Sequence, residues 1–201
     1  MTSLSDSGAI FAYHRAMIKK HGNKGTGALG WREPEHQLLR FKELAQIADL
    51  NGCTVIDAGC GHADLLPFLL EKYPQLKHYY GIEMMPELLD NAMAHYGNLP
   101  NTTFLSANFM TRALPEADYI LVCGSLNYSS GNPGYIFEAI EKLYKSASRG
   151  LAFNLLRSVS AEGVLRAYNP AVITRFCRTL SKNVVLKDSY ADEDFTVLMH
   201  R

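Results

Sequence analysis

The chain of 201 residues is 47% apolar and carries no net charge, with 20 basic and 20 acidic side chains. This length suits one domain with a sizeable core, and the apolar content excludes a disordered chain. Proteins that grip a phosphate backbone usually carry a basic surplus, so the neutral balance disfavours nucleic acid as a partner. We therefore expect a single domain over residues 1–201.

The cysteine pattern and the N-terminal residues indicate the cellular compartment in which we expect the protein. The four cysteines show no Cys-x-x-Cys spacing and no partnering histidine pair, so no metal site is expected. Three lie in or beside apolar runs, which is typical of buried thiols in a reducing compartment. No basic region followed by an apolar stretch opens the chain, and no run approaches the ~18 apolar residues of a spanning helix. These features predict a soluble, cytoplasmic protein without a membrane partner.

The first 50 residues divide into two expected parts. Residues 1–33 show no regular apolar period, and the four glycines within residues 21–30 predict a mobile loop. A helix is then expected from Pro34 to about Leu50, where the pair Asn51-Gly52 ends it.

Strands and helices alternate over the rest of the chain. The expected strands are residues 53–58, 78–82, 102–105, 118–123, 150–156, 183–186 and 195–199. The expected helices are residues 62–73, 86–96, 134–146 and 170–181. Alternation predicts crossover connections, and the last two strands are too close for a crossover helix. The predicted fold is α/β: a doubly wound, mostly parallel seven-stranded sheet with helices on both faces and a C-terminal antiparallel hairpin strand.

The turn after the first expected strand carries the most information. Asp57 is followed by Gly59 and Gly61, which let the backbone approach a ligand at the carboxyl ends of the strands. A dinucleotide needs a further glycine at position 64, which is Asp64, and Asp57 would face its pyrophosphate. S-adenosylmethionine instead offers an ammonium and a sulfonium, which Asp57 attracts directly or through water. The alternative is a purely structural turn with a helix-capping acid.

A second acid ends the second expected strand. Glu83 stands about 20 residues after Gly61, where such folds place a carboxylate on a ribose diol. Two acceptor oxygens suit two hydroxyl donors, and Met84 beside them offers an adaptable apolar surface for adenine. The alternative is a solvated glutamate at a strand end.

With these two motifs, residues 53–201 resemble the class I S-adenosylmethionine-dependent methyltransferases of small-molecule type. The family's acid-x-Gly-x-Gly-x-Gly pattern is matched except at its third glycine, where Ala63 stands. The resemblance implies S-adenosyl-L-methionine as donor and S-adenosyl-L-homocysteine as product. It also implies that Asn108 and Phe109 border the adenine and that the backbone after the fourth strand meets the methionine end. The expected donor-site residues are Asp57, Gly59, Cys60, Gly61, Glu83, Met84, Asn108, Phe109, Cys123 and Gly124.

The sequence does not identify a catalytic residue. Methyl transfer is an in-line displacement that depends on alignment, and a general base helps only if the acceptor loses a proton. Candidates are His14, Asn127 and Tyr128, although Asn127 could equally stabilise its own loop. The Ser-Leu-Asn-Tyr run at 125–128 lacks the two prolines of the DNA-base amino methyltransferases, so that activity is not supported.

The remaining expectations concern the acceptor. Residues 1–50 are expected to form a lid and helical segment over a donor-binding core of residues 51–201. Tyr13 and Trp31 would close the mouth of the pocket, unless Trp31 only packs on the helix that it precedes. Three residues after the fifth strand would contact an anionic acceptor or else are solvated; they are Arg157, Arg166 and Tyr168.

We expect a small-molecule acceptor, because the N-terminal segment and the connector at residues 157–182 are each long enough to roof a small pocket. The alternatives are a methyltransferase acting on RNA or protein, a nucleotide-binding oxidoreductase, and a catalytically silent protein that binds the donor. The oligomeric state and the atom that accepts the methyl group have no sequence signal.

Overall fold

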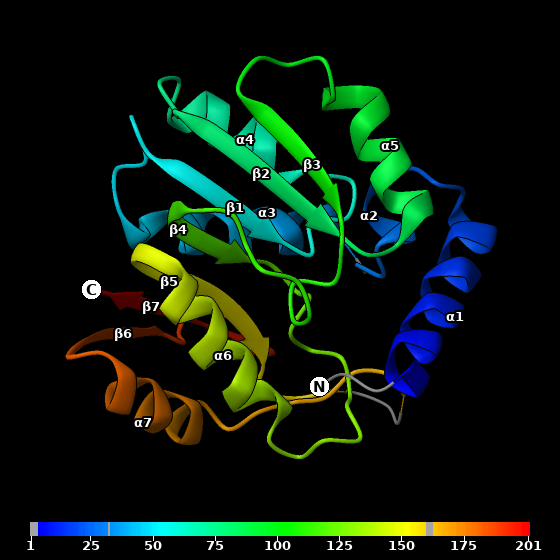
Figure 1. Ribbon diagram of the computed structural model, residues 1–201. Coiled ribbons are helices and arrows are strands. Elements are labelled where there is room, and N and C mark those ends of the chain that lie inside the picture. The colour runs from blue at the N-terminus through cyan, green and yellow to red at the C-terminus, as the bar shows by residue number, and fades with distance from the viewer. Residues whose placement is uncertain (1–3, 32, 160–162) are drawn as a thin grey trace.

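A seven-stranded sheet forms the centre of the computed structural model, which describes residues 4–31, 33–159 and 163–201 (Figure 1). The strands are β1 (Thr54–Ala58), β2 (His78–Glu83), β3 (Thr102–Ser106), β4 (Ala117–Val122), β5 (Ala147–Leu156), β6 (Asn183–Lys187) and β7 (Asp194–His200). Their order across the sheet is β3-β2-β1-β4-β5-β7-β6. The first five strands pair in parallel, and β7 runs antiparallel between β5 and β6. The expected fold class and the C-terminal hairpin are confirmed.

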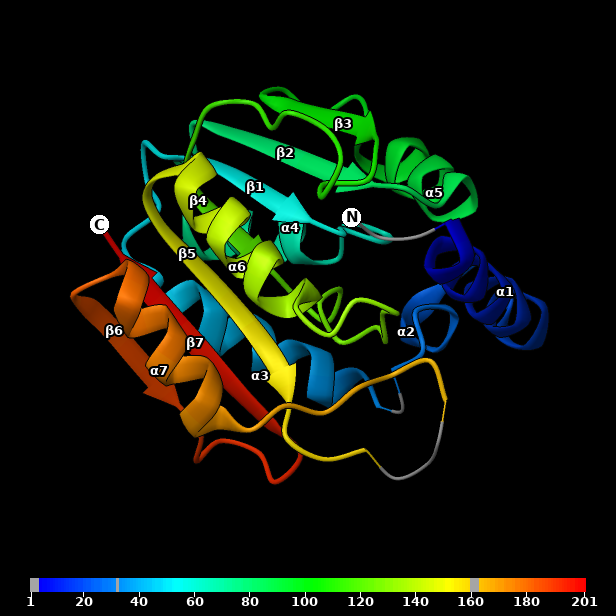
Figure 2. The ribbon, with the colours of Figure 1, turned by 60° about the horizontal axis from the view of Figure 1, so that its bottom comes forward.

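Helices cover both faces of this sheet (Figures 1 and 2). They are α1 (Leu4–His21), α2 (Gly25–Ala28), α3 (Pro34–Leu44), α4 (Leu65–Lys72), α5 (Pro86–Tyr96), α6 (Tyr135–Ser146) and α7 (Pro170–Leu180), and a 3-10 turn spans Ala45–Ile47. α6 and α7 bury their apolar stripes in one core, whereas α3, α4 and α5 contribute to the other. No helix among the described residues is both long and apolar enough to span a bilayer.

Local sequence explains where several helices begin. α3, α5 and α7 each carry proline in the first turn, where the missing N–H costs nothing. α7 is also capped by Asn169, whose side-chain oxygen accepts hydrogen bonds from the backbone N–H groups of Ala171 and Val172. α4 begins three residues later than expected, because Ala63 takes a φ of 61° and holds the preceding residues in a turn.

The N-terminal segment differs from the sequence expectation. Residues 1–33 were expected to be irregular, but Leu4–His21 form an 18-residue helix and Gly25–Ala28 a short one within the expected mobile loop. From residue 7 to the end of α1, the buried side chains are Ile10 and His14, one turn apart, and so narrow an apolar stripe does not stand out in the sequence. α1 lies beside the carboxyl ends of the parallel strands rather than on a sheet face (Figure 2).

Candidate functional site

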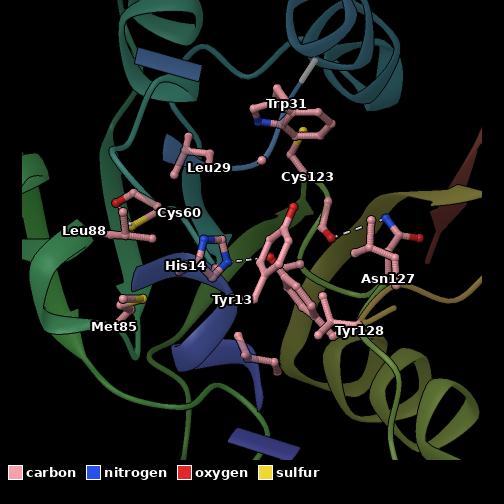
Figure 3. A pocket seen from close by; sticks show the side chains of 18 of the residues that line it. Tyr13, His14, Leu29, Trp31, Cys60, Met85, Leu88, Cys123, Asn127 and Tyr128 are labelled. Atoms are coloured by element: carbon pink, nitrogen blue, oxygen red, sulfur yellow. Dashed lines mark hydrogen bonds between the residues drawn. The ribbon is translucent and has the colours of Figure 1, made fainter. Parts of the chain in front are cut away.

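A cavity of about 500 Å³ opens at the carboxyl ends of β1, β2 and β4. Figure 3 shows walls from the turn after β1, the end of β2, the loop after β4, α1 and the segment before α3. The loop after β3 and the connector after β5 also line the cavity. All ten expected donor-site residues line this cavity. So do His14, Asn127, Tyr128, Tyr13 and Trp31, whereas Arg157, Arg166 and Tyr168 are not among its lining residues.

The turn after β1 has the geometry of a close-approach loop. Gly59 and Gly61 have φ values of 80° and 56°, which side chains rarely adopt. A Cβ on Gly59 would collide with Ser125, and one on Gly61 would lie 2.8 Å from Leu29 Cδ2. Because these two residues have no Cβ, Ser125 and Leu29 can pack directly against the backbone of the turn.

Asp57, in the carboxyl half of β1, is buried, and one of its two carboxyl oxygens accepts a hydrogen bond from a described residue. Its Oδ2 accepts a hydrogen bond from the Tyr79 hydroxyl at 2.7 Å, while its Oδ1 is buried without a partner among the described residues. Burial raises the pKa of Asp57 to about 7; the Tyr79 hydrogen bond opposes this shift, and the negative charges of Glu83 and Asp64 add to it. The site thus contains a buried carboxyl oxygen, Asp57 Oδ1, that can accept a hydrogen bond from a ligand, and a bound cation would favour the ionised form of Asp57. Asp57 does not cap α4, so the capping alternative is not what the geometry shows.

Glu83 is buried rather than solvated. Its Oε1 accepts from the backbone N–H groups of Met84 and Met85, each at 2.8 Å, and its Oε2 accepts from Gly61 at 3.0 Å. Burial raises the pKa of Glu83, and the three backbone hydrogen bonds oppose the shift. A carboxylate offers about four acceptor positions, so this arrangement leaves one on Oε2 for a ligand hydroxyl.

The end of β4 is fixed by its neighbours in the sheet. Gly124 has a φ of 79°, and its N–H donates to Asn154 Oδ1 of β5 at 2.9 Å. The Ser125 hydroxyl donates to the carbonyl of Ala58 at the end of β1, at 2.6 Å. These two contacts fix the backbone at Cys123 and Gly124, which line the cavity.

The loop after β3 supplies another part of the cavity wall. Asn108 Oδ1 accepts from the N–H of Met110 at 2.8 Å, so this side chain also shapes its own turn. Phe109 packs in the core below the cavity, near Gly59. Both positions border the part of the cavity where adenine was expected.

Trp31 packs between α3 and the end of β4. The guanidinium of Arg40 lies 4.3 Å from the centroid of its ring, and a Cβ on Gly124 would lie 3.0 Å from the same ring. Trp31 therefore contacts the helix that it precedes and also lines the cavity, so the two alternatives for this residue are not exclusive. Arg40 in turn forms a buried ion pair with Asp194 of β7.

On the acceptor side, two expected candidates meet. His14 Nε2 of α1 lies 2.5 Å from the hydroxyl of Tyr128, which follows β4 (Figure 3). The ring of Tyr13 packs edge-on against both, with centroid distances of 5.3 Å to His14 and 6.5 Å to Tyr128. Burial lowers the pKa of His14 and raises the pKa of Tyr128, so both are uncharged at neutral pH.

Asn127 has a different part in the same loop. Its Oδ1 accepts from the N–H of Leu156 at 2.8 Å, its Nδ2 donates to the carbonyl of Gly124, and its carbonyl accepts from Arg166 at 2.7 Å. Asn127 thus ties the loop after β4 to β5 and to the connector. Its side chain is already used by backbone groups.

The arginines after β5 turn away from the cavity. Arg157 donates to the carbonyl of Asp188 at 2.6 Å, and Arg166 stacks on Tyr168 at 5.7 Å from the ring centroid. In this conformation neither offers its charge to an anionic acceptor.

Sequence reasoning missed three residues that shape the site: Tyr79, Arg40 and Asn154. Tyr79 and Asn154 look like ordinary strand residues, and Arg40 like a solvated helix residue, because their partners are remote in the chain. A buried position within an otherwise apolar strand was the one available signal for Asn154. Among the described residues, no group of three or more His, Cys, Asp or Glu side chains is placed to hold a metal ion.

Comparisons with known proteins agree with this geometry, although no family model matches the chain. A curated relative, an uncharacterized RNA methyltransferase from Halalkalibacterium halodurans, is 27% identical over 148 residues, which are 73% of this chain and 30% of that protein. The chain therefore spans under a third of that relative's length.

Solved structures match over nearly the whole chain. Magnesium protoporphyrin IX methyltransferase from Synechocystis PCC 6803 with bound S-adenosylhomocysteine has a TM-score of 0.71 at 16% identity, over 98% of this chain and 99% of that one. The N-methyltransferase NodS from Bradyrhizobium japonicum WM9, also with S-adenosylhomocysteine, has a TM-score of 0.70 at 16% identity, over 96% and 98%. The chain thus has the fold of the S-adenosylmethionine-dependent methyltransferases.

Proposed function

We propose that the protein transfers a methyl group from S-adenosylmethionine to a small-molecule acceptor. The observation that carries the proposal is Asp57 Oδ1, a buried carboxyl oxygen to which none of the described residues donates a hydrogen bond, in the cavity that Glu83 and the glycine turn also line. A buried acceptor of this kind is costly unless a ligand completes it. The ammonium group of S-adenosylmethionine has the charge and the donors to do so.

The other donor-site residues have matching parts. Glu83 Oε2 would accept one ribose hydroxyl, and Asn108 and Phe109 would border the adenine. The backbone at Gly124 would meet the methionine end, where Arg40 also lines the cavity. The donor supplies an electrophilic methyl group, and the chain's own contribution is to hold the acceptor in line with it and to exclude water.

The size and cover of the cavity support a small acceptor. Residues of α1, of the connector after β5 and Trp31 contribute to the cavity wall, so a small acceptor would contact protein on several sides. Among the described lining residues, Arg40 is the one arginine or lysine, and Asp194 already pairs with it. A nucleic-acid substrate would call for free basic groups near the pocket.

Methyl transfer to RNA is the second candidate, and the name of the Halalkalibacterium relative is its support. That match covers under a third of the relative, so its substrate-binding parts have no necessary counterpart here. Binding of a short structured RNA, measured against salt concentration, separates the two. Submicromolar binding that weakens steeply with salt would favour RNA and count against the small-molecule proposal.

Isothermal titration calorimetry with S-adenosylmethionine, S-adenosylhomocysteine and NAD tests the donor site. We expect both adenosyl ligands to bind and NAD to bind far more weakly, because Asp57 and Asp64 repel a pyrophosphate. NAD binding tighter than the adenosyl ligands would overturn the assignment. Donor binding without turnover on any acceptor would point instead to a silent donor-binding protein.

A further inference from the structure

The acceptor half of the cavity is built from rings and neutral hydroxyls. Tyr13, His14 and Tyr128 pack edge-on against one another, and Ser129 and Tyr135 lie along the same wall. Aromatic rings arranged in this way favour a flat ring between or beside them. The surface therefore suits an acceptor that carries a ring.

Charge on the cavity wall disfavours an anion. The described acidic lining residues are Asp57, Asp64, Glu83 and Glu193. Arg40 is the one strongly basic side chain among the described lining residues, and its ion pair with Asp194 offsets it. An acceptor carboxylate or phosphate would meet net negative charge in a poorly solvated space, which costs free energy.

The pair formed by Tyr128 and His14 is arranged to take a proton. His14 Nε2 and the Tyr128 hydroxyl oxygen lie 2.5 Å apart; the His14 side chain is buried and that of Tyr128 is partly buried. His14 Nδ1 is buried, with the Ala28 carbonyl near it though outside hydrogen-bonding geometry. That carbonyl favours the tautomer protonated on Nδ1, which leaves the Nε2 lone pair to accept from the Tyr128 hydroxyl. The Tyr128 oxygen then keeps acceptor capacity for a second donor.

We propose that the acceptor is an uncharged ring compound that reacts through a hydroxyl group, and that Tyr128 and His14 together remove the hydroxyl proton. This inference rests on the proposed methyl transfer. The acceptor oxygen bonds to the methyl carbon as the carbon–sulfur bond breaks and leaves its electron pair on sulfur. The hydroxyl proton moves to the Tyr128 oxygen as Tyr128 gives its own proton to His14 Nε2, and His14 later releases a proton to water. Tyr128 is the catalytic residue, and His14 is a positioning residue that acts through it.

A binding experiment tests the acceptor class on the full chain saturated with S-adenosylhomocysteine. The probes share one ring and differ in one group: 4-nitrophenol, 4-nitroanisole and 4-nitrobenzoate. At a pH where 4-nitrophenol is neutral, we expect it to bind at least tenfold more tightly than the anion 4-nitrobenzoate. Tyr128→Phe should abolish the preference for 4-nitrophenol over 4-nitroanisole, while the matched control Tyr80→Phe, in β2 outside the cavity lining, should keep it. Equal or tighter binding of 4-nitrobenzoate overturns the proposal.

A rate experiment tests the proton relay. Rates are compared at pH 8 with S-adenosylmethionine and saturating acceptor, so that the weaker binding expected of the 4-nitrophenolate anion does not enter the comparison. At this pH 4-nitrophenol is already largely ionised, whereas phenol must lose its proton during the reaction. Tyr128→Phe and His14→Gln should therefore slow methylation of phenol by roughly 10²-fold, the lower end for general base catalysis. The same substitutions should slow methylation of 4-nitrophenol by a factor at least ten times smaller. Equal losses with both acceptors would show a merely structural role and overturn the relay.

The affinity for S-adenosylhomocysteine, measured on each variant, keeps the two proposals apart. If the adenosyl ligand binds but no phenol binds or reacts, the acceptor proposal fails and the donor site stands. If the adenosyl ligand does not bind to the wild type, both proposals fail. Variants with wild-type affinity for it are folded, so a loss of phenol methylation in them is not a loss of structure.

Discussion

The Tyr79 hydroxyl of β2 donates a 2.7 Å hydrogen bond to Asp57 Oδ2 of β1, and this contact opposes the rise in the pKa of Asp57 that burial causes. Both residues are buried, and the two strands are direct neighbours in the sheet. Burial raises the pKa of Asp57 to about 7, and the Tyr79 hydrogen bond is the one contribution that lowers it. If Asp57 binds the donor as proposed, we expect donor binding at neutral pH to depend on a hydroxyl that does not itself line the cavity.

The first prediction is a pH-dependent donor affinity. A bound cation favours ionised Asp57, so binding releases a proton whenever Asp57 is protonated in the free protein. We expect the affinity for S-adenosylmethionine to be level above about pH 7 and to fall by up to tenfold per unit below it. Calorimetry from pH 5.5 to 8.5 measures this. Tyr79→Phe should move the transition to higher pH and Asp57→Asn should remove it; a transition at the same pH in Tyr79→Phe would contradict the account.

The second prediction concerns stability against pH. Because folding raises the pKa of Asp57 from 3.8 to about 7, the folded chain holds more protons than the unfolded chain between these values. The contribution of Asp57 to the free energy of unfolding is therefore present at low pH and is lost as pH rises through this window. Relative to the wild type, Asp57→Asn should become more stable as pH increases from 5 to 8. Urea unfolding at several pH values checks the sign; a constant difference between the two proteins would refute it.

The third prediction separates two roles of Glu83, one in the stability of the fold and one in ribose binding. Its carboxylate accepts three backbone hydrogen bonds, so Glu83→Ala is expected to lower the free energy of unfolding by about 1–3 kcal/mol. The ribose contact should appear separately, as weaker binding of 2′-deoxyadenosine or 3′-deoxyadenosine than of adenosine. That preference should disappear in Glu83→Ala; its persistence would mean that another group binds the ribose.

The fourth prediction uses the unusual backbone at Ala63. Its φ of 61° lies in the left-handed region, where a Cβ costs roughly 1–2 kcal/mol. Ala63→Gly relieves this strain but removes a buried methyl group worth about 0.8 kcal/mol. We expect a free energy of unfolding within about 1 kcal/mol of the wild type, and unchanged donor affinity. The control Ala58→Gly, in a buried strand, should destabilise by more than 1 kcal/mol; equal losses at both positions would argue against strain at Ala63.

The fifth prediction tests the N-terminal segment as a lid. Asn23 joins it to the donor site: its Oδ1 lies 2.9 Å from His62 Nε2, and its Nδ2 donates to the Glu87 carbonyl at 2.6 Å. We expect S-adenosylhomocysteine to slow hydrogen exchange over residues 10–31. Asn23→Ala should speed that exchange and weaken ligand binding by about 1 kcal/mol, whereas Asn183→Ala on β6 should do neither. Protection that does not change on ligand binding would remove the lid and leave the donor site unaffected.

The sequence by itself determined the sheet and the helices after Pro34, and it predicted a donor site at the carboxyl ends of the strands. Those features follow from local patterns: apolar runs, prolines at helix starts and glycines at a turn whose backbone needs positive φ. Parallel strands present their carboxyl ends at one edge, and Asp57 and Glu83, near the ends of neighbouring strands, line the same cavity there. α1 escaped this kind of reasoning because it packs over a cavity mouth and buries only a narrow stripe.

Only the tertiary structure decided which side chains pair across the site. His14 and Tyr128 are 114 residues apart in the chain, and Arg40 and Asp194 are 154 apart. The same holds for the turning of Arg157 onto Asp188, away from the cavity where an acceptor contact was expected. Such pairs have no local signature, because they depend on strand order, on the path of each crossover and on where α1 crosses the strand ends. Their partners are set by the packing of whole elements, which no short stretch of sequence contains.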